Sequence, residues 1–182
     1  MKNINYQDII SLKLCDSIDV KGYFTRNWSG TLLNVLSSEN IPNKDRIWLV
    51  TRFLPDRENH LFMLWCAENA LNQRLMSNLD PRSIAAIQAK RDWLDGKITI
   101  EQLDDAASSA WMVAHEGCEY REFAWSAWFA VWSDNEAFAA TNTANESAMA
   151  AQAAEGWDYK ALEYARGKQI EYLKKIVTEK DI

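Results

Sequence analysis

The side chains best suited to chemistry are the two histidines of the chain, His60 and His115. His115 is followed by Cys118 and Glu119, three and four residues later, so a helix would place all three on one face. Together they could form a Cys–His pair or supply two or three ligands to a metal ion. A structural zinc site needs four ligands, however, and a catalytic one needs three with supporting hydrogen bonds. A partly buried histidine beside a buried cysteine is therefore the simpler interpretation, and His60, which opens an apolar segment, is interpreted as a capping or surface histidine.

Other motifs for catalysis or cofactor binding are missing from the sequence. Neither histidine belongs to the Glu-x-x-His pattern of di-metal helical bundles. The glycines form neither of the glycine-rich patterns that cradle phosphates, and no Gly-x-Ser-x-Gly turn supports a nucleophilic serine. We therefore predict a protein that is not an enzyme and uses no metal or cofactor. A metal-dependent or Cys/His enzyme built on His115, Cys118 and Glu119 is the alternative.

Charge is distributed unevenly along the chain, whose formal net charge is −6. Residues 92–159 carry 13 acidic and two basic side chains, and no Lys or Arg occurs between Arg121 and Lys160. Eight carboxylates of this segment are the candidate partner-binding residues: Asp92, Asp95, Glu101, Asp104, Asp105, Glu116, Glu119 and Glu122. The three between positions 101 and 105 lie where a helix is expected to start, and negative charge is locally favourable there. The others are expected to lack basic partners, so the segment predicts an acidic face that fits a basic protein.

An aromatic stripe lies inside the acidic segment. Trp125, Trp128, Phe129 and Trp132 follow the spacing of one helical face. Such a stripe could line a ligand pocket or stack on nucleic-acid bases, but we interpret it as core, because alanines between these positions leave room for a neighbouring helix. Base stacking also needs basic side chains close by, and Arg121 is the only one. Direct binding of nucleic acid is therefore not expected.

The elements that must position these residues are predicted to be helices. Asp80 before Pro81, Thr99 three residues before Gln102, and Asp158 at the start of a helix that reaches about residue 178 are strong capping signals. The further caps that we predict are Asn43, Asp56, Ser133 with Glu136, and Thr143 with Glu146. The nearly all-round apolar segment after Asp56 is expected in the middle of a bundle. We predict an all-α bundle or array of about seven to nine helices in one domain, residues 1–182, with an N-terminal helical part at 1–41 and the main bundle at 42–178.

Composition supports this prediction. The first 66 residues contain no alanine, whereas 23 alanines lie between Ala67 and Ala165, which predicts closely packed helices in the second half. The longest apolar run, Leu61 to Ala67, is too short to span a bilayer. The N-terminal residues lack the apolar stretch of a secretory signal, and three distant cysteines form no disulfide framework. We therefore expect a cytoplasmic protein that does not bind membranes.

Several short motifs occur between residues 45 and 114. They are Asp45-Arg46-Ile47-Trp48, Arg52-Phe53-Leu54-Pro55, Cys66-Ala67-Glu68, Asp80-Pro81-Arg82-Ser83 and Gly96-Lys97-Ile98-Thr99. In these motifs the chain resembles a family of immunity proteins, which are helical proteins of bacterial and phage genomes associated with toxin systems. The resemblance implies an all-α array and an activity of stoichiometric inhibition, in which the protein blocks a toxin by binding it, without catalysis or a cofactor.

The leading hypothesis is a non-enzymatic inhibitor that binds a basic partner, such as a toxin or a nucleic-acid-processing protein, through its acidic helices. A close variant is a phage-encoded inhibitor of a bacterial defence system, of the anti-CRISPR or anti-restriction type, with carboxylates where the target expects phosphates. A third interpretation is a helical protein whose tryptophan-rich faces pack against copies of itself, so the sequence leaves the oligomeric state open.

Overall fold

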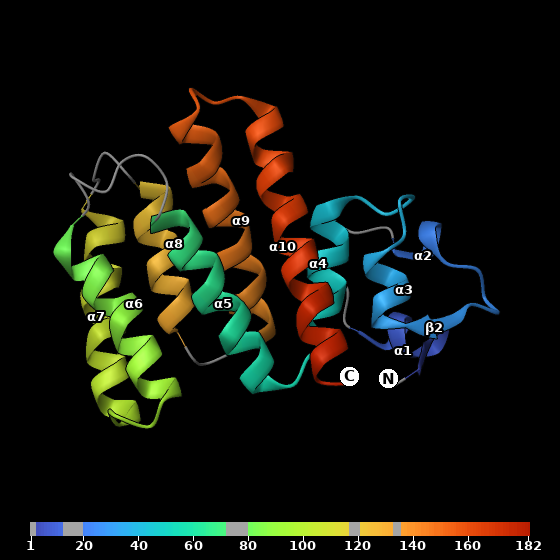
Figure 1. Cartoon of the computed structure of the whole chain (residues 1–182), viewed down its shortest axis with the longest axis horizontal. Helices are drawn as coiled ribbons and strands as arrows, with labels where there is room; N and C mark the ends of the chain where they lie inside the picture. Colours follow the sequence, from blue (N-terminus) through green and yellow to red (C-terminus); the bar gives the residue numbers. More distant parts are fainter. Residues whose placement is uncertain (1–2, 13–19, 72–79, 117–120, 133–135) are drawn as a thin grey trace.

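The protein is helical over almost all of the chain that the computed structural model describes, residues 3–12, 20–71, 80–116, 121–132 and 136–182, which confirms the predicted all-α class (Figure 1). Its elements are β1 (Asn3–Asn5), α1 (Tyr6–Ser11), α2 (Val20–Tyr23), β2 (Ser29–Thr31), α3 (Leu32–Leu36), α4 (Asn43–Thr51), α5 (Asp56–Leu71), α6 (Pro81–Leu94), α7 (Ile100–His115), α8 (Arg121–Val131), α9 (Glu136–Ala154) and α10 (Tyr159–Glu179). The strands β1 and β2 form one antiparallel pair of three residues each, with Ile4 opposite Gly30. Within the described ranges, no helix has both the length and the apolar character that crossing a bilayer requires.

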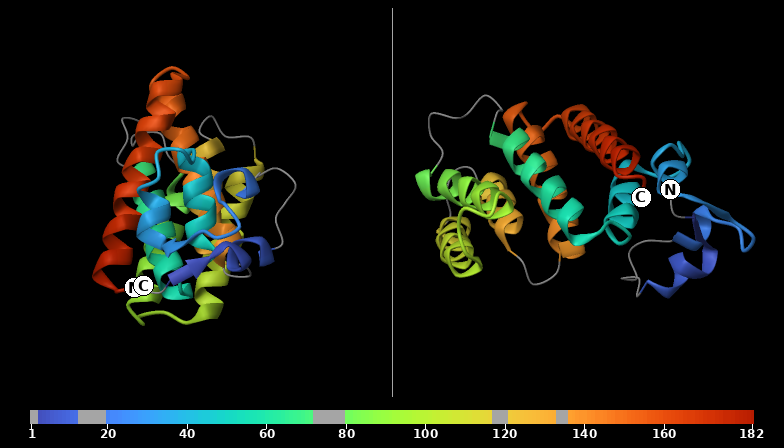
Figure 2. Two further views of the ribbon diagram at one scale, coloured as in Figure 1. Left: turned by 90° about the vertical axis from the view of Figure 1, so that its right-hand side faces the viewer. Right: turned by 60° about the horizontal axis from the view of Figure 1, so that its bottom comes forward.

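The helices form an elongated array (Figures 1 and 2). The α6–α7 pair lies at one end and the β1–β2 pair at the other, with α5, α8, α9, α10 and α4 between them. The N-terminal elements pack onto this array, because Leu32, Val35 and Leu36 of α3 are buried in the same apolar cluster as Ile47 of α4 and Ile170 of α10. Residues 20–41 thus share a core with the bundle.

Helix α5 occupies the middle of the array, as its all-round apolar pattern predicts. Phe62, Met63, Cys66 and Ala67 are completely buried, and the helix contacts α6, α8, α9 and α10. Its neighbours α8 and α9 approach closely because their contact faces are alanine, with Ala127, Ala130, Ala139, Ala140 and Ala144 all buried. The alanine-rich half of the sequence therefore forms the closely packed helices expected of it.

Three of the predicted helix caps are present. The Asp80 carboxylate accepts a hydrogen bond from the Arg82 backbone N–H, with Pro81 in the first turn, and Asp158 accepts one from the Lys160 N–H at the start of α10. Thr99 and Gln102 form a complete capping box at the start of α7. Such caps satisfy backbone N–H groups that a helix start leaves without partners.

Other cap predictions are wrong or lie outside the described residues. Thr143 lies in the middle of α9, where its hydroxyl donates to the Ala139 carbonyl one turn back, so α9 runs through the predicted start. Asn43 is already helical and makes no cap, because Pro42 takes that place. For Asp56 the structure gives no capping bond, since α5 already begins there. The Ser133 prediction falls outside the described residues.

Replacing Thr99 with alanine is expected to lower the free energy of unfolding by about 1 kcal/mol, because the Gln102 backbone N–H loses its hydroxyl acceptor. Urea denaturation followed by circular dichroism measures this loss. Ser108→Ala is the matched control, since Ser108 is exposed in the same helix and alanine is the better helix former there. An equal loss in both variants would argue against a stabilising cap.

Candidate functional site

Helix α7 positions part of the predicted acidic face. Its buried side, Leu103, Ala107 and Ala110, packs in the α6–α8 region, which leaves Asp104 and Asp105 exposed on the opposite side. Among the described residues, no cation forms an ion pair with either of these two carboxylates. Nearby, hydrogen bonds from the Thr99 side chain and from its own backbone lower the pKa of Glu101 below its usual value. None of these three carboxylates forms an ion pair with a cation in the described ranges.

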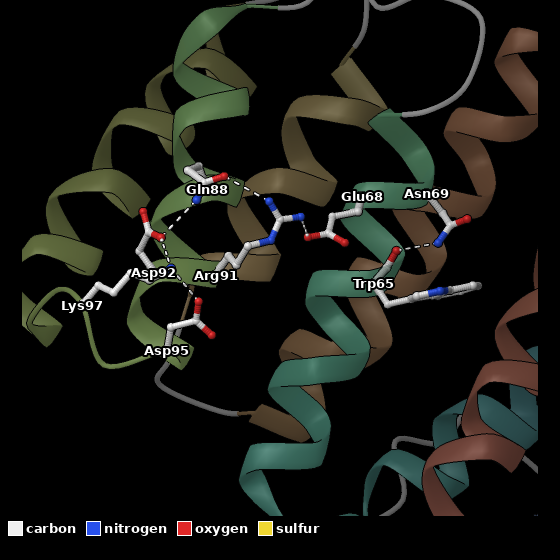
Figure 3. Close-up of polar contacts among 8 residues, drawn as sticks. All are labelled: Trp65, Glu68, Asn69, Gln88, Arg91, Asp92, Asp95 and Lys97. Carbon is white, nitrogen blue, oxygen red and sulfur yellow. Dashed lines mark hydrogen bonds and ion pairs between the residues drawn. The ribbon is translucent and has the colours of Figure 1, made fainter.

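The predicted lack of basic partners is wrong for Asp92 and Asp95, which both pair with Lys97 (Figure 3). The Lys97 ammonium lies 2.7 Å from one Asp95 oxygen and 3.3 Å from one Asp92 oxygen. The hydrogen bond from Lys97 lowers the pKa of the Asp95 carboxyl. The turn after α6, whose Gly96 has a positive φ of 73°, bends the chain back toward these carboxylates. The Lys97 ammonium thus balances one of these two negative charges.

The prediction is also wrong for Glu116, at the carboxyl end of α7. Its carboxylate pairs with Arg82 of α6 at 2.6 Å, and the same guanidinium holds Asp80 at 2.8 Å. The Arg82 bonds lower the pKa of both carboxyl groups. Glu122 in the first turn of α8 is partly buried and has no ion pair to a described residue. Glu119 lies outside the described residues.

The predicted acidic residues therefore do not form one cluster. Asp104 and Glu116 are twelve positions apart on α7, a separation of about 18 Å along a helix. Asp92, Asp95 and the carboxylates at positions 101–105 lie near the α6–α7 turn, while Glu116 and Glu122 lie near the other end of α7. The carboxylates that remain without a described cation are four: Glu101, Asp104, Asp105 and Glu122.

Seven rings form a continuous aromatic surface across α7, α8 and α9. Its members, which define the term from here on, are Trp111, His115, Trp125, Trp128, Phe129, Trp132 and Phe138. Ring centroids of successive neighbours are 4.0 Å apart for Trp111 and His115, 4.8 Å for His115 and Trp125, and 5.9 Å for Trp132 and Phe138. Contacts of this kind add to the stabilisation from buried area. The rings therefore support one another as a single unit.

The interpretation of the α8 stripe as core holds only in part, because Trp125, Trp128 and Trp132 pack against buried clusters but keep some exposed surface. The alanines of α8 are buried against its neighbours, whereas Trp125, Trp128, Phe129 and Trp132 are only partly buried. The rings therefore lie at the edge of the core, with one side against buried residues and the other toward solvent. Both ends of the surface are open to solvent, with Trp111 46% and Phe138 45% exposed. Met112, 50% exposed, lies beside Trp111.

The two histidines have different environments from those predicted. His60 is buried in α5, edge-on to the Trp93 ring at 4.8 Å, which corrects its interpretation as a surface or capping residue. Burial, and secondly the charge of Lys90, lower its pKa to about 3. His115 is exposed, its ring lies between those of Trp111 and Trp125 and is tilted against both, and its Nδ1 lies 2.9 Å from the Trp111 carbonyl oxygen.

Only part of the alternative metal or Cys/His site lies among the described residues. Cys118 and Glu119 lie outside the described residues, and His115 uses its ring in the aromatic surface. Within the described ranges, no three His, Cys, Asp or Glu side chains come together as a metal site would need.

Sequence reasoning missed the two exposed ends of the aromatic surface. Trp111 precedes His115 by one helical turn, a spacing that places the two rings on one face and could have indicated the extension onto α7. Nothing in the sequence around Phe138 indicates that its ring meets those of α8, because the contact depends on how α8 and α9 cross. Comparisons of the chain with protein families, with curated proteins and with solved structures find no significant match. The site must therefore be interpreted from its own geometry.

Proposed function

We propose that this protein is a non-enzymatic binding protein that inhibits a basic partner protein. The aromatic surface makes the contact, and the neighbouring carboxylates speed association by attracting the partner's positive charge. One observation carries the proposal: seven touching rings that end in half-exposed Trp111 and Phe138. Tryptophan and other aromatic residues are enriched at the energetic centres of protein interfaces. A large exposed apolar patch is also costly in water unless a partner covers it.

Carboxylates border this surface on the side of α7 and α8. Asp104 precedes Trp111 by seven residues, so both lie on one side of α7, about 10 Å apart along its axis. Glu122 precedes Trp125 by three residues on α8. An apolar centre with an acidic border fits a partner that presents apolar side chains ringed by Lys or Arg. Two copies of this chain would instead bring like charges together, which disfavours a symmetric dimer through this surface.

The resemblance to immunity proteins supports the same class of protein, an inhibitor that acts by binding its target. The motifs that carry it serve the scaffold: Asp80 and Thr99 cap helices, while Trp48, Leu54 and Cys66 are buried. The aromatic surface uses other residues, as expected where the scaffold is common and the partner differs. We propose a toxin or another nucleic-acid-processing protein as the partner. A phage-encoded inhibitor of a bacterial defence complex would use the same surface.

Reversing Asp104 and Asp105 to lysine is expected to slow association with the partner by about tenfold at low salt, because border charges act mainly on the rate of encounter. The free energy of unfolding should change little, since both side chains are exposed without described ion pairs. The partner is first captured from a native-host lysate with tagged protein, then purified. Association rates and inhibition of its activity are measured at two salt concentrations.

The control for charge is Glu39→Lys with Glu155→Lys, which changes net charge equally at two exposed positions away from α7. This control should retain wild-type association. If the Asp104/Asp105 variant and the control associate at the same rate, the acidic border does not guide binding. A protein that captures no partner and self-associates through its tryptophans supports the third interpretation instead.

A further inference from the structure

A cavity of about 230 Å³ lies where α4, α9 and α10 meet, apart from the aromatic surface. Figure 1 shows these three helices side by side, and their contacts confirm it. The cavity is far larger than one water molecule needs. Charged and amide side chains border it, chiefly Lys44 and Asp45 from α4, Asn142 and Asn145 from α9, and Arg166 and Gln169 from α10.

Asp45 provides a buried negative charge on one side. The residue is only 7% exposed, and its one hydrogen bond to a described side chain comes from the neutral Tyr23 hydroxyl at 2.9 Å. A carboxylate has about four acceptor positions, so most of its capacity is unused by that bond. The start of α4 adds only a partial positive charge. A buried carboxylate is normally matched by a full cation. Lys44 borders the same cavity, but it is exposed and none of the described ion pairs joins it to Asp45.

Arg166 provides a positive charge on the opposite helix. Its side chain is 13% exposed and donates to Glu163 at 2.7 Å and to Asn145 Oδ1 at 3.3 Å. Burial works to raise the pKa of Glu163, but hydrogen bonds from Arg166 and from Asn43 outweigh it, so the pKa lies below its usual value. A guanidinium has five N–H groups, and these two bonds leave donors for a further acceptor. Among the described ion pairs, none joins Arg166 to Asp45.

A second buried group borders the same cavity. The Gln169 side-chain nitrogen donates to the Ala144 carbonyl at 2.8 Å and to the Ser147 hydroxyl at 2.9 Å. Its oxygen is buried and accepts no hydrogen bond from the described residues. Ile47 and Trp48 supply an apolar wall. The cavity is thus lined by a carboxylate on α4, a guanidinium on α10 and apolar side chains of α4.

We propose that this cavity binds a small zwitterion, a free α-amino acid. Its ammonium group lies at Asp45, its carboxylate accepts hydrogen bonds from Arg166, and its side chain contacts Ile47 and Trp48. The two opposite charges of such a ligand match two protein charges that do not pair with each other. This site is separate from the proposed protein-binding surface, so either can exist without the other.

Isothermal titration calorimetry with each common L-amino acid, added singly to the full-length protein, tests the proposal. We expect one-to-one binding of at least one of them. The methyl ester of that amino acid lacks the carboxylate, and its N-acetyl derivative lacks the ammonium. Each should bind about tenfold or more weakly, because each loses one charged pair.

The Asp45→Asn variant keeps the size and the acceptor for Tyr23 but removes the charge. It should weaken binding of the parent amino acid about tenfold while leaving binding of the N-acetyl derivative unchanged. Asp56→Asn, the same change at an exposed helix start, is the control and should bind as wild type. Absence of binding by every amino acid, equal binding of the N-acetyl derivative, or wild-type affinity in Asp45→Asn would each overturn the proposal.

Discussion

A variant with serine in place of Trp111 and Phe138 is expected to bind the partner protein about a hundredfold or more weakly than wild type. Trp111 and Phe138 are the most exposed tryptophan and phenylalanine of the aromatic surface, and truncating an aromatic side chain that serves as a binding hot spot costs about 2 kcal/mol or more. The free energy of unfolding should change little, because both side chains are nearly half exposed before binding. The loss should appear mainly in the dissociation rate.

Surface plasmon resonance with the purified partner measures these rates, and urea denaturation measures the stability. Trp157→Ser is the matched control, because Trp157 is 59% exposed in the turn between α9 and α10, away from the aromatic surface. It should bind as wild type. Unchanged affinity in the Trp111/Phe138 variant would remove the aromatic surface as the binding site, whatever the charge-reversal variant does.

The second large effect concerns the stability in acid. The folded protein holds the pKa of His60 at about 3, against an ordinary value of 6.5. Below pH 6.5 the His60 imidazole is therefore protonated in the unfolded chain, whereas in the folded protein it stays neutral down to about pH 3. Protonation of His60 thus costs no stability above pH 6.5. As the pH falls from 6.5 toward 3, it progressively lowers the free energy of unfolding. With allowance for residual solvent screening, the loss is on the order of 2–4 kcal/mol.

His60→Phe isolates this contribution from the carboxylates that also weaken the fold in acid. Phenylalanine keeps a ring against Trp93 but takes up no proton. Urea denaturation at a series of pH values from 7 to 4 should give a shallower decline for this variant than for wild type. His115→Phe changes the other, exposed histidine and serves as the control. If His60→Phe loses stability in acid as steeply as wild type does, the buried imidazole is not the cause.

Local signals in the sequence predicted the helices well. Asp80-Pro81, Thr99 with Gln102, and Asp158 each act through neighbours two or three residues away, so the sequence alone contains all of the interacting groups. Thr143 has the same local pattern and fails, because the helix around it continues and its hydroxyl bonds backward instead. A capping pattern is thus informative only where the chain has another reason to stop.

The candidate site was harder to predict, because its features depend on which helix faces meet. Helix α8 has an alanine side and an aromatic side, and hydrophobic periodicity does not distinguish the buried one from the exposed one. Glu116 forms an ion pair with Arg82, 34 positions away, and only the packing of α6 against α7 brings the two side chains together. Asp45 and Arg166 line the same cavity although they are more than a hundred positions apart in the sequence.

The division of α8 into an alanine side and an aromatic side separates two kinds of evolutionary constraint. The buried alanines tolerate little change, since a larger side chain there would push α8 away from α5 and α9. On the other side, Trp125, Trp128 and Trp132 also pack against buried residues, whereas Trp111 and Phe138 at the two ends of the aromatic surface are nearly half exposed and can be exchanged with less effect on the scaffold. A library that varies only the exposed positions Trp111, Met112 and Phe138 should therefore yield many folded proteins with altered partner preference.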